Sequence, residues 1–458
     1  MLITENQKNI FIVIAFLLLI ASSFFIENLK SHSKESVKTI QFWHYWSGVE
    51  KKPIDNLARK FNAENHDFKV KVLSISMPRK KILTAIVGNV APDLVHVDGD
   101  MVTDFALRNA LQEIDLTEFE VGKFNPNFLK MLNINCSLSE KSHMQGLRKG
   151  KERSLLSVNE RSSTEYNAAD GALQTGCQWA MPYIGGTEAM YINKDLMDKW
   201  GLKTPQSLED LVNVFDKSLE KDKDSIAFIP SWPSWFGEFL PAYFGGSWTD
   251  KEGKVTANSK ENIEAWQWIE NNFIAKMPAE KILSFSEGFG AYQSPDNPFY
   301  SGKVAIEASG VWEKKLATIY APKMNVEVSA FPGKVKDATY LSVNALAIPR
   351  NAPNKKEALM FLKWLLKPEN VEYLALDQKQ FTPYNEHSDK FFEEHENPFI
   401  RTFINLGKSP NAQFMPQVKF LTRYKKEIKS AYDKVIRRQQ TAQEALDELQ
   451  EKIVKLAN

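Results

Sequence analysis

Tryptophan and acidic residues lie in several segments of this sequence that are expected to form loops. Trp43 and Trp46 belong to the aromatic segment 42–46, Glu50 follows it, and Asp98 comes directly after a later apolar run. A sugar presents hydroxyl groups for hydrogen bonds and C–H faces for stacking, so its site needs aromatic rings beside carboxylates. These residue types at the ends of expected strands therefore indicate a site for a polar small molecule such as a sugar.

In two further segments, tryptophan lies beside glycine or proline, which are typical of turns. Trp232 and Trp235 lie in segment 231–235 around a proline, and Trp312 follows Gly310 in a Gly-x-Trp sequence. Any one of these tryptophans is equally well explained as a core residue. Their shared position beside turns and strand ends favours a common binding role.

The motifs that common catalytic mechanisms require are absent from the sequence. It has no G-x-x-x-x-G-K-[ST] phosphate loop, no H-E-x-x-H zinc motif and no G-x-S-x-G nucleophile turn. The seven histidines are scattered, and none pairs with another at the spacing of metal ligands. We therefore expect no enzyme activity, no cofactor and no metal. A glycosidase is the enzyme alternative that stays open, because it needs only two carboxylates.

Length and composition set the class of protein that must position these residues. The chain has 458 residues, 43% of them hydrophobic and 25% charged, which is ordinary for a globular protein of two or three domains. Lys and Arg number 58 and Asp and Glu 57, so the chain lacks the basic excess of a nucleic-acid-binding protein. Collagen, coiled-coil, disordered and polytopic membrane proteins are also excluded.

The N-terminal region, residues 1–37, is expected to lie outside the fold. Residues 10–26 form an apolar run of a length between a signal-peptide core and a membrane span. Cleavage after Ala21-Ser22-Ser23 would release the protein, and an uncleaved segment would anchor it in the inner membrane. No Cys follows the run, which excludes a lipoprotein anchor. Either way we expect export to the periplasm or another extracytoplasmic compartment.

The two cysteines flank an insertion. Cys136 and Cys177 enclose residues 137–176, which are rich in Ser, Lys, Arg, Glu and Gly and are typical of a surface excursion. In an oxidising compartment we expect the two to pair, closing a loop worth about 3–4 kcal/mol of stability. The alternative is two unpaired buried thiols.

Periodicity predicts an α/β fold with a mostly parallel sheet. Strand-like alternation and helix-like spacing follow each other along the first hundred residues, and the pattern resumes after the insertion. Strands are predicted at 39–43, 69–73, 93–97, 179–182 and 189–192; helices are predicted at 54–61, 82–87, 107–111 and 354–366, after a Ser207 cap and after a Thr441 capping box.

Taken in their order along the chain, the motifs resemble a known family. The sequence is similar to extracellular solute-binding proteins of family 1, the sugar-binding group that includes maltose-binding protein. The matching segments are 42–48, 91–95, 180–182, 191–196, 245–259, 299–312 and 442–446. They cover most of the chain from residue 38 onward.

The resemblance implies a two-lobed, class II periplasmic-binding-protein-like α/β fold with a hinge and an interlobe ligand cleft. It assigns residues 38–185 and 305–342, with the insertion, to lobe 1, and residues 186–304 and 343–458 to lobe 2. Gly185 and Gly186 would form one hinge crossing, with the others near 304–310 and 341–344. The family's members deliver a ligand to an ABC permease, and we expect a monomer.

By the same resemblance, ten residues are carried over as ligand-binding candidates. Aromatic rings among them would stack on sugar faces, and the carboxylates would accept hydrogen bonds from hydroxyl groups. They are Trp43, Trp46, Glu50, Asp98, Tyr183, Trp232, Trp235, Gly310, Trp312 and Tyr384.

Other functions stay open at this stage. The same fold would accept a glycerol-phosphate ester, a polyamine or a metal, and a tethered version would act as a sensor subunit. The chain also departs from the usual family pattern in its insertion, its lack of a lipid-acceptor Cys and the absence of a clear arginine-bearing phosphate loop.

Overall fold

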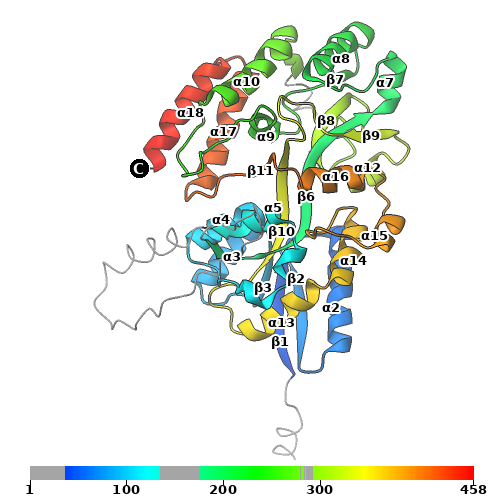
Figure 1. Cartoon of the computed structure of the whole chain (residues 1–458). Coiled ribbons are helices and arrows are strands. Elements are labelled where there is room, and N and C mark those ends of the chain that lie inside the picture. Colours follow the sequence, from blue (N-terminus) through cyan, green and yellow to red (C-terminus); the bar gives the residue numbers. More distant parts are fainter. Residues whose placement is uncertain (1–36, 135–175, 279, 283, 285–291, 458) are drawn as a thin grey trace, which may run out of the picture.

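The computed structural model describes residues 37–134, 176–278, 280–282, 284 and 292–457 (Figure 1). The predicted N-terminal export segment and nearly all of the predicted insertion lie outside these residues. Cys136 does as well, so its pairing with the buried Cys177 stays a prediction. Within the described part of the chain, no helix has the length and apolar character needed to cross a bilayer.

The described residues form two lobes, each with its own hydrophobic core (Figure 1). The lower lobe in Figure 1, lobe 1, contains three parallel strands covered by helices. Its elements are β1 (Lys38–His44), β2 (Phe68–Ser74), β3 (Leu94–Asp98), α2 (Lys52–Glu64), α3 (Pro78–Val87), α4 (Gly99–Leu107), α5 (Pro126–Leu132), α13 (Lys355–Leu365), α14 (Pro368–Gln378) and α15 (Asp389–Glu394).

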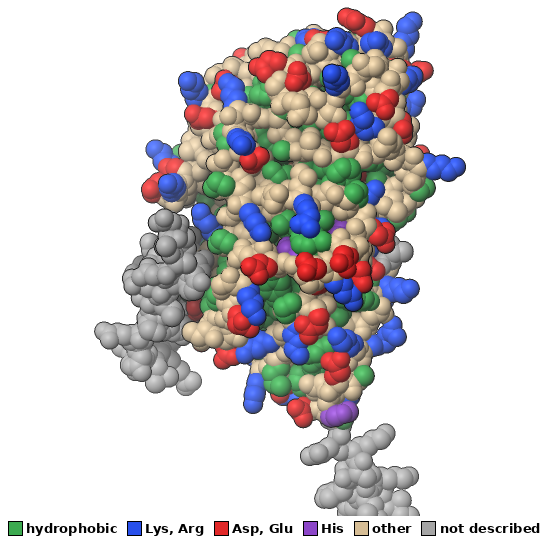
Figure 2. Space-filling model, turned by 45° about the vertical axis from the view of Figure 1, so that its right-hand side comes forward, with side chains coloured by type: hydrophobic (Ala, Val, Ile, Leu, Met, Phe, Trp, Pro, Cys, Tyr) green, Lys and Arg blue, Asp and Glu red, His purple; other side chains and the backbone are tan. Residues whose placement is uncertain are grey.

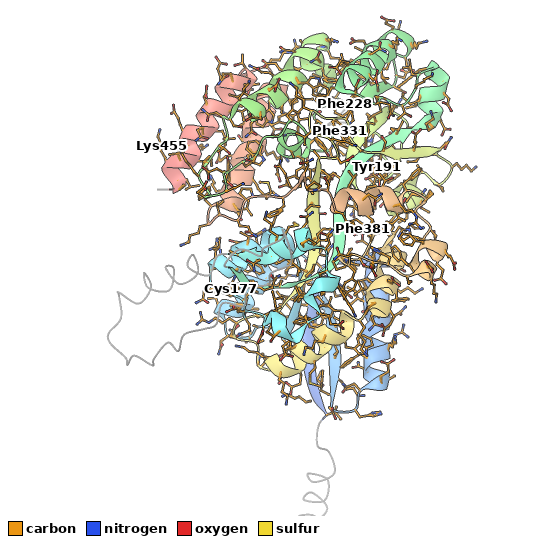
Figure 3. All side chains as sticks on the ribbon, viewed as in Figure 1. Cys177, Tyr191, Phe228, Phe331, Phe381 and Lys455 are labelled. Atoms are coloured by element: carbon orange, nitrogen blue, oxygen red, sulfur yellow. The ribbon has the colours of Figure 1, made fainter. Side chains whose placement is uncertain are left out.

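The upper lobe, lobe 2, packs helices around a second group of strands. In Figure 3, Phe228 and Phe331 lie inside this lobe, where their rings and that of Phe236 contact one another. Its elements are β7 (Ile226–Phe228), β8 (Val304–Gly310), β9 (Val326–Ser329), α7 (Lys194–Trp200), α8 (Leu208–Lys221), α9 (Phe236–Tyr243), α10 (Lys260–Asn272), α17 (Leu421–Ile436) and α18 (Ala442–Ala457).

Two long strands join the lobes into one sheet of order β2-β1-β3-β10-β6-β8-β7. β6 (Met181–Asn193) pairs with β10 (Thr339–Ala347) on the lobe 1 side and with β8 and β9 on the lobe 2 side. Short elements complete the lobes and the junction between them. They are β4 (Asn133–Ile134), β5 (Cys177–Gln178), β11 (Ala412–Gln413), α12 (Glu313–Tyr320), α16 (Ile400–Gly407), η1 (Gly48–Lys51), η2 (Leu116–Glu118), η3 (Val121–Lys123) and η4 (Ile274–Lys276).

The division of the chain between the lobes differs from the sequence prediction. Strand β8, expected in lobe 1, pairs with β7 and with the upper half of β6, so its backbone is satisfied in lobe 2. Helix α13, expected in lobe 2, covers β1: the Phe361 ring lies 5.8 Å from the Phe42 ring and 4.8 Å from the Phe61 ring. The assignments of 305–310 and 355–365 were therefore wrong, and so were those of 368–378 and 389–394, whose helices α14 and α15 pack in the lobe 1 core. Strand pairing and apolar helix faces, rather than order along the chain, decide lobe membership.

The sheet is mixed rather than mostly parallel. Strands β1, β2 and β3 are parallel, as are β7 and β8, but β10 runs antiparallel to both β3 and β6. The two short strands predicted at 179–182 and 189–192 are one strand, β6, buried along its whole length. The helix predicted at 107–111 was wrong, because α4 runs before it and ends at Leu107.

The residues that cap helix ends were predicted more reliably than the topology of the sheet. Ser207 accepts a hydrogen bond from the Asp210 backbone at the start of α8. The Thr441 hydroxyl accepts from the Glu444 backbone at 3.2 Å, and the Glu444 carboxylate accepts from the Thr441 backbone at 2.9 Å. Both caps are confirmed, since they depend on residues within one turn of the chain.

Gly185 and Gly186 lie inside β6, where it passes from lobe 1 toward lobe 2. Neither has a positive φ, so the strand continues through both without a left-handed turn. What they provide is space. A Cβ on Gly185 would lie 2.8 Å from the rings of Phe128 and Phe381, and one on Gly186 would lie 2.3 Å from the Ser342 hydroxyl. Phe381 lies at this junction in Figure 3.

Candidate functional site

In lobe 1, aromatic rings gather around a buried histidine, His96, on β3. The Tyr45 ring stacks on His96 at 4.9 Å between centroids, and the rings of Trp46 and Tyr183 meet it edge-on at 4.7 and 5.9 Å. Strand β1 delivers Tyr45 and Trp46 because it runs parallel to β3 and ends beside it. The structure therefore brings together Trp46 and Tyr183, two of the predicted residues.

A polar network continues from these rings to the carboxyl end of β3. The Tyr45 hydroxyl lies 2.5 Å from a carboxylate oxygen of Asp98, to which it donates, and also contacts Asn344 Oδ1. Asn344 Oδ1 in turn lies 3.0 Å from His96 Nε2. Burial, followed by the charge of His44, lowers the pKa of His96 to about 3, so the imidazole is neutral at neutral pH. Asp98 is exposed and is thus available to a ligand.

Two predicted lobe 1 residues lie apart from this group. Trp43 points to the opposite side of β1 from His44, and its indole donates to Gln41 Oε1 at 3.3 Å. Tyr384 packs against Phe124 at 4.7 Å and its hydroxyl donates to the Leu366 carbonyl, so the structure places it in the core of lobe 1. The sequence pattern did not separate these structural aromatics from the others.

Glu50 lies where three elements meet. Its carbonyl accepts from Gln378 Nε2 on α14 at 3.0 Å, and its carboxylate faces the charge of Lys315 on α12. Burial raises the pKa of Glu50 and the Lys315 charge partly offsets that rise. Lys315 also pairs with Asp377 at 3.1 Å, which ties α12 to α14.

In lobe 2, three of the predicted residues surround Tyr292. The rings of Trp232 and Trp235 lie 6.1 and 4.7 Å from the Tyr292 ring, and Trp312 Nε1 donates to the Tyr292 hydroxyl at 3.2 Å. The remaining predicted residue, Gly310, makes room for this arrangement, because a Cβ there would lie 2.2 Å from the Trp312 ring. Trp235, Tyr292 and Trp312 are half-buried, so their rings reach the surface of the cluster.

Buried carboxylates lie beneath these rings. Glu307, on β8, accepts from Trp232 Nε1 at 3.0 Å. Glu313, at the start of α12, accepts from the Tyr292 hydroxyl and from Ser309 Oγ at 3.0 Å. Burial raises the pKa of both groups, and the charge of Glu313 raises that of Glu307 further. Glu188 on β6 lies in the same cluster, and its pKa is raised by burial and by the Glu313 charge.

Sequence patterns did not reveal the groups on which the two clusters depend. The missed residues are Tyr45, His96, Glu188, Tyr292, Glu307, Glu313 and Asn344. Some carried a readable signal. His96 and Glu307 each interrupt an otherwise apolar strand, and a polar residue inside a buried strand has to be accounted for by a partner or a function.

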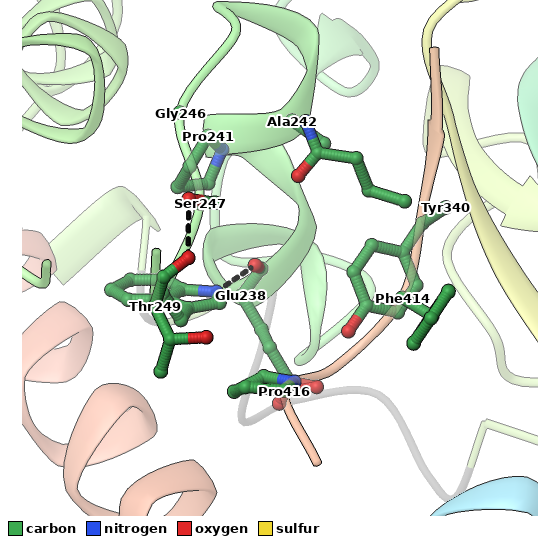
Figure 4. A pocket seen from close by; sticks show the side chains of 11 residues that line it. Glu238, Pro241, Ala242, Gly246, Ser247, Thr249, Tyr340, Phe414 and Pro416 are labelled. Atoms are coloured by element: carbon green, nitrogen blue, oxygen red, sulfur yellow. Dashed lines mark hydrogen bonds between the residues drawn. The ribbon is translucent and has the colours of Figure 1, made fainter. Parts of the chain in front are cut away.

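A small cavity lies beside α9 near the junction of the lobes (Figure 4). Glu238, Trp248, Tyr340, Phe414 and Pro416 are among its lining residues, and Trp248 Nε1 donates to the Glu238 carbonyl at 2.8 Å. Its volume is ≈ 50 Å³, whereas pockets for drug-sized ligands have about 300–1,000 Å³. None of the predicted site residues lines it. This cavity holds water-sized molecules rather than a sugar.

One lysine connects the two lobes through acidic partners. Lys425 on α17 lies 2.5 Å from the Asp100 carboxylate on α4 and 3.0 Å from that of Glu238 on α9. Although burial lowers the pKa of Lys425, the charges of Asp100 and Glu238 raise it above its ordinary value. Burial raises the pKa of Glu238 to about 7.

Elsewhere on the surface, charges of both signs are mixed. On the face seen in Figure 2, Lys and Arg side chains lie between Asp and Glu side chains. This face shows no continuous basic stripe of the kind that nucleic-acid-binding proteins present.

Two α/β lobes joined by shared strands, with rings and carboxylates near the junction, define a two-lobed solute-binding protein. The family model described as "bacterial extracellular solute-binding protein" matches residues 56–397. The chain belongs to this family. Proteins of the family bind small-molecule solutes outside the cytoplasm and work with ABC permeases.

Individual relatives show the same architecture with different ligands. The sn-glycerol-3-phosphate-binding periplasmic protein of Escherichia coli strain K12 is 23% identical over 445 residues, covering 90% of this chain and 91% of the relative. The mannobiose-bound structure of CpMnBP1 has 19% identity and a TM-score of 0.72, covering 91% of this chain and 99% of that chain. Maltose-bound MalE3 of T. maritima has 19% identity, a TM-score of 0.68 and the same coverage. These structural likenesses establish the fold.

Proposed function

We propose that this chain is the carbohydrate-binding receptor of an ABC importer and releases its ligand to the permease. The observation that carries the proposal is the lobe 2 cluster, in which Trp232 donates to Glu307, Tyr292 donates to Glu313 and Trp235 packs against Tyr292. Rings for the C–H faces and acceptors for the hydroxyl groups are what a sugar requires. Structural neighbours with bound mannobiose and bound maltose support it.

In this proposal the ligand lies between the two lobes and closes them by hinge bending. Strands β6 and β10 are the connections that would bend, near Gly185 and Gly186. Asp98 and Tyr45 would approach the ligand from lobe 1 and Trp235 from lobe 2. The Lys425–Asp100 pair would form part of the closed state, because it joins α17 to α4.

A glycerol-phosphate ester is the second candidate, because the relative from E. coli is named for that ligand. A phosphate needs cationic partners in the site. Among the described residues, cations near the clusters are already paired: Lys315 with Asp377, Lys425 with Asp100 and Glu238, and Arg79, which lies near Asp98, with Asp104. The acidic lobe 2 cluster therefore favours an uncharged or cationic solute over a phosphate.

A sensor subunit is the remaining alternative from a different functional class. It would use the same site but would stay tethered through residues 10–26 and report to a membrane partner instead of feeding a permease. A membrane-retained protein whose deletion abolishes a transcriptional response but not solute uptake would identify this function.

The test is a calorimetric titration of the purified protein with mono- and oligosaccharides, sn-glycerol 3-phosphate and spermidine. We expect binding of one sugar class, with affinity lowered about 100-fold or more in Trp235→Ala, since an aromatic anchor in a central pocket is typical of a binding hot spot. Trp364→Ala is the matched control, because Trp364 is also half-buried but stacks on Phe361 in lobe 1. Binding of the phosphate alone would contradict the proposal.

A further inference from the structure

Three glutamates of the lobe 2 cluster are almost completely buried. Glu188 is 2% exposed, and Glu307 and Glu313 are 0% exposed. Each keeps one carboxylate oxygen, Oε2 of Glu188 and Oε1 of the other two, that accepts no hydrogen bond from a described donor, and the carboxyl groups of Glu307 and Glu313 lie within hydrogen-bond reach of each other. Their negative charges repel one another when they are ionised. The charge of Glu313 raises the pKa of both Glu188 and Glu307, and the charge of Glu188 also raises the pKa of Glu307.

No basic side chain compensates these charges in the described part of the chain. The groups that contact them are Trp232, Trp235, Tyr292, Tyr300 and Ser309, together with one another. Burying unpaired carboxylates is costly, so they must take up protons or meet a cation. Stability alone would be served better by apolar residues at these positions, which indicates that the acidity serves binding.

Two observations independent of the acids point to a ligand here. The first is the set of half-buried rings of Trp235, Tyr292 and Trp312, which gives the cluster an aromatic edge that a cation favours. The second is the Tyr243 hydroxyl. Tyr243 is 1% exposed, its hydroxyl has no partner among the described residues, and the carboxylate whose charge it faces is Glu188.

We propose that this cluster binds a protonated amine, so that the solute delivered by this protein carries an ammonium group. The inference rests on the proposed function as a solute receptor and narrows its ligand. An ammonium would donate to the open oxygens of Glu188, Glu307 and Glu313 while Trp235 and Tyr292 face it with their rings. An amino sugar and an aliphatic polyamine share this chemistry, and hydroxyl groups of an amino sugar would additionally reach Tyr243 and Trp235 Nε1.

The chemistry of the cluster disfavours other charged ligands. A phosphate or carboxylate ligand would find no cationic partner in this cluster and would be repelled by each of the three carboxylates that is ionised. Among the described residues, no group of three or more His, Cys, Asp and Glu side chains has the arrangement of a metal site. A soft, shaped organic cation fits aromatic rings and scattered carboxylates better than a compact metal ion does.

The experiment compares ligands that differ only in charge. Titration calorimetry is run with the glucosamine disaccharide, its neutral N,N′-diacetylated form, spermidine and sn-glycerol 3-phosphate. We expect at least one amine to bind, and the glucosamine disaccharide to bind about 100-fold more tightly than its acetylated form if the ligand is a sugar. Preference for spermidine over both disaccharides would identify the polyamine as the source of the ammonium.

Variants locate the effect within the cluster. Glu188→Gln and Glu307→Gln should each lower amine affinity at least about tenfold without abolishing folding, since the amide is nearly isosteric with the carboxyl group. Glu427→Gln is the matched control: Glu427 is also buried, but it pairs with Arg423 on α17 and Lys452 on α18. Circular dichroism confirms that each variant is folded before titration.

The outcomes separate this inference from the proposed function. Equal binding of the amino and acetylated disaccharides overturns the ammonium and keeps the carbohydrate receptor. Binding of spermidine alone keeps the ammonium and overturns the carbohydrate. Binding of glycerol phosphate alone overturns both. Failure of every amine to bind, with the protein folded, overturns the inference.

Discussion

The two lobes use similar residues near their junction but treat charge in opposite ways. In lobe 1, the acidic residue Asp98 is exposed and hydrogen-bonded to Tyr45, and the buried titratable group beside it is the neutral His96. In lobe 2, Glu307 and Glu313 are buried. Lobe 1 pairs its carboxylate with Tyr45, although His96 Nδ1 and the Tyr183 hydroxyl have no partner among the described residues, whereas lobe 2 leaves carboxylate oxygens without donors. The difference teaches that the surroundings of the carboxylate, and not the presence of rings beside it, distinguish a candidate binding cluster.

Replacement of a tryptophan in each lobe gives the largest contrast. Trp46 is 5% exposed and packs on His96, so Trp46→Ala should lower the free energy of unfolding by about 3–5 kcal/mol. Trp235→Ala removes a half-buried ring and should cost clearly less. Urea unfolding followed by circular dichroism measures both. If Trp235→Ala lowered the free energy of unfolding more than Trp46→Ala, Trp235 would have the structural role, and the proposed difference between the lobes would be wrong.

The buried acids of lobe 2 should make stability fall as pH rises. The folded-state pKa of Glu307 is raised by burial, so above the ordinary carboxyl value of 4.5 the unfolded chain has lost a proton that the folded chain keeps. Glu307→Gln should therefore raise the free energy of unfolding at pH 8, by about 1.4 kcal/mol for each pH unit by which the pKa of Glu307 is raised. Urea titrations at pH 5 and pH 8 measure the effect, which should be small at pH 5. A variant less stable than the parent protein at pH 8 would contradict it.

The buried histidines of lobe 1 should make the stability of the protein fall as pH falls, which is opposite to the effect of the buried acids. Burial lowers the pKa of His96 to about 3 and that of His44 to about 4, both below the ordinary value of 6.5. Between pH 6.5 and about 4 the unfolded chain binds protons that the folded chain does not, so stability falls as pH falls. His96→Phe keeps an aromatic ring but cannot bind a proton, so this loss should shrink by about 1.4 kcal/mol for each pH unit by which the pKa of His96 is lowered. Parallel unfolding curves of the two proteins over this range would exclude the effect.

Removal of a single hydroxyl should have a smaller effect. Tyr45→Phe leaves Asp98 and Asn344 without their shared partner and should cost about 1–1.5 kcal/mol. Tyr373→Phe is the control, because the Tyr373 hydroxyl accepts from Asn56 at an exposed position and should change stability by less than about 0.5 kcal/mol. Thermal unfolding monitored by calorimetry compares the two.

The smallest change in stability is expected from the interlobe ion pair. Lys425→Met removes a partly exposed pair with Asp100, which solvent screens, and leaves the largely buried Glu238 without its lysine; because the pKa of Glu238 is already raised to about 7, this group can take up a proton, and the total cost should be about 1 kcal/mol. Its effect should instead appear in shape: small-angle scattering of the ligand-free variant should give a larger radius of gyration than the parent protein. An unchanged radius would show that Lys425 does not hold the lobes together.

Much of the local structure was predictable because it depends on neighbours in the chain. The strands at β1, β2 and β3 follow from alternation, and the caps at Ser207 and Thr441 from side chains within one turn. The assignment of β8 and α13 to lobes was not predictable, because it depends on pairing between segments more than a hundred residues apart. For the candidate site, the tryptophans of lobe 2 were proposed from the sequence and the structure groups them around Tyr292, but Tyr292 and the three buried glutamates were not predicted.

The sequence by itself determined that this chain has the ordered motifs of its family, a near-neutral charge and no catalytic signature. Those properties are read residue by residue, from composition and short-range spacing. Only the tertiary structure decided which aromatic residues serve the core, as Tyr384 does, and which face unpaired carboxylates, as Trp235 and Tyr292 do. Burial and the loss of hydrogen-bond partners are created by contacts between distant segments, so the charge preference of a site emerges only when the chain is folded.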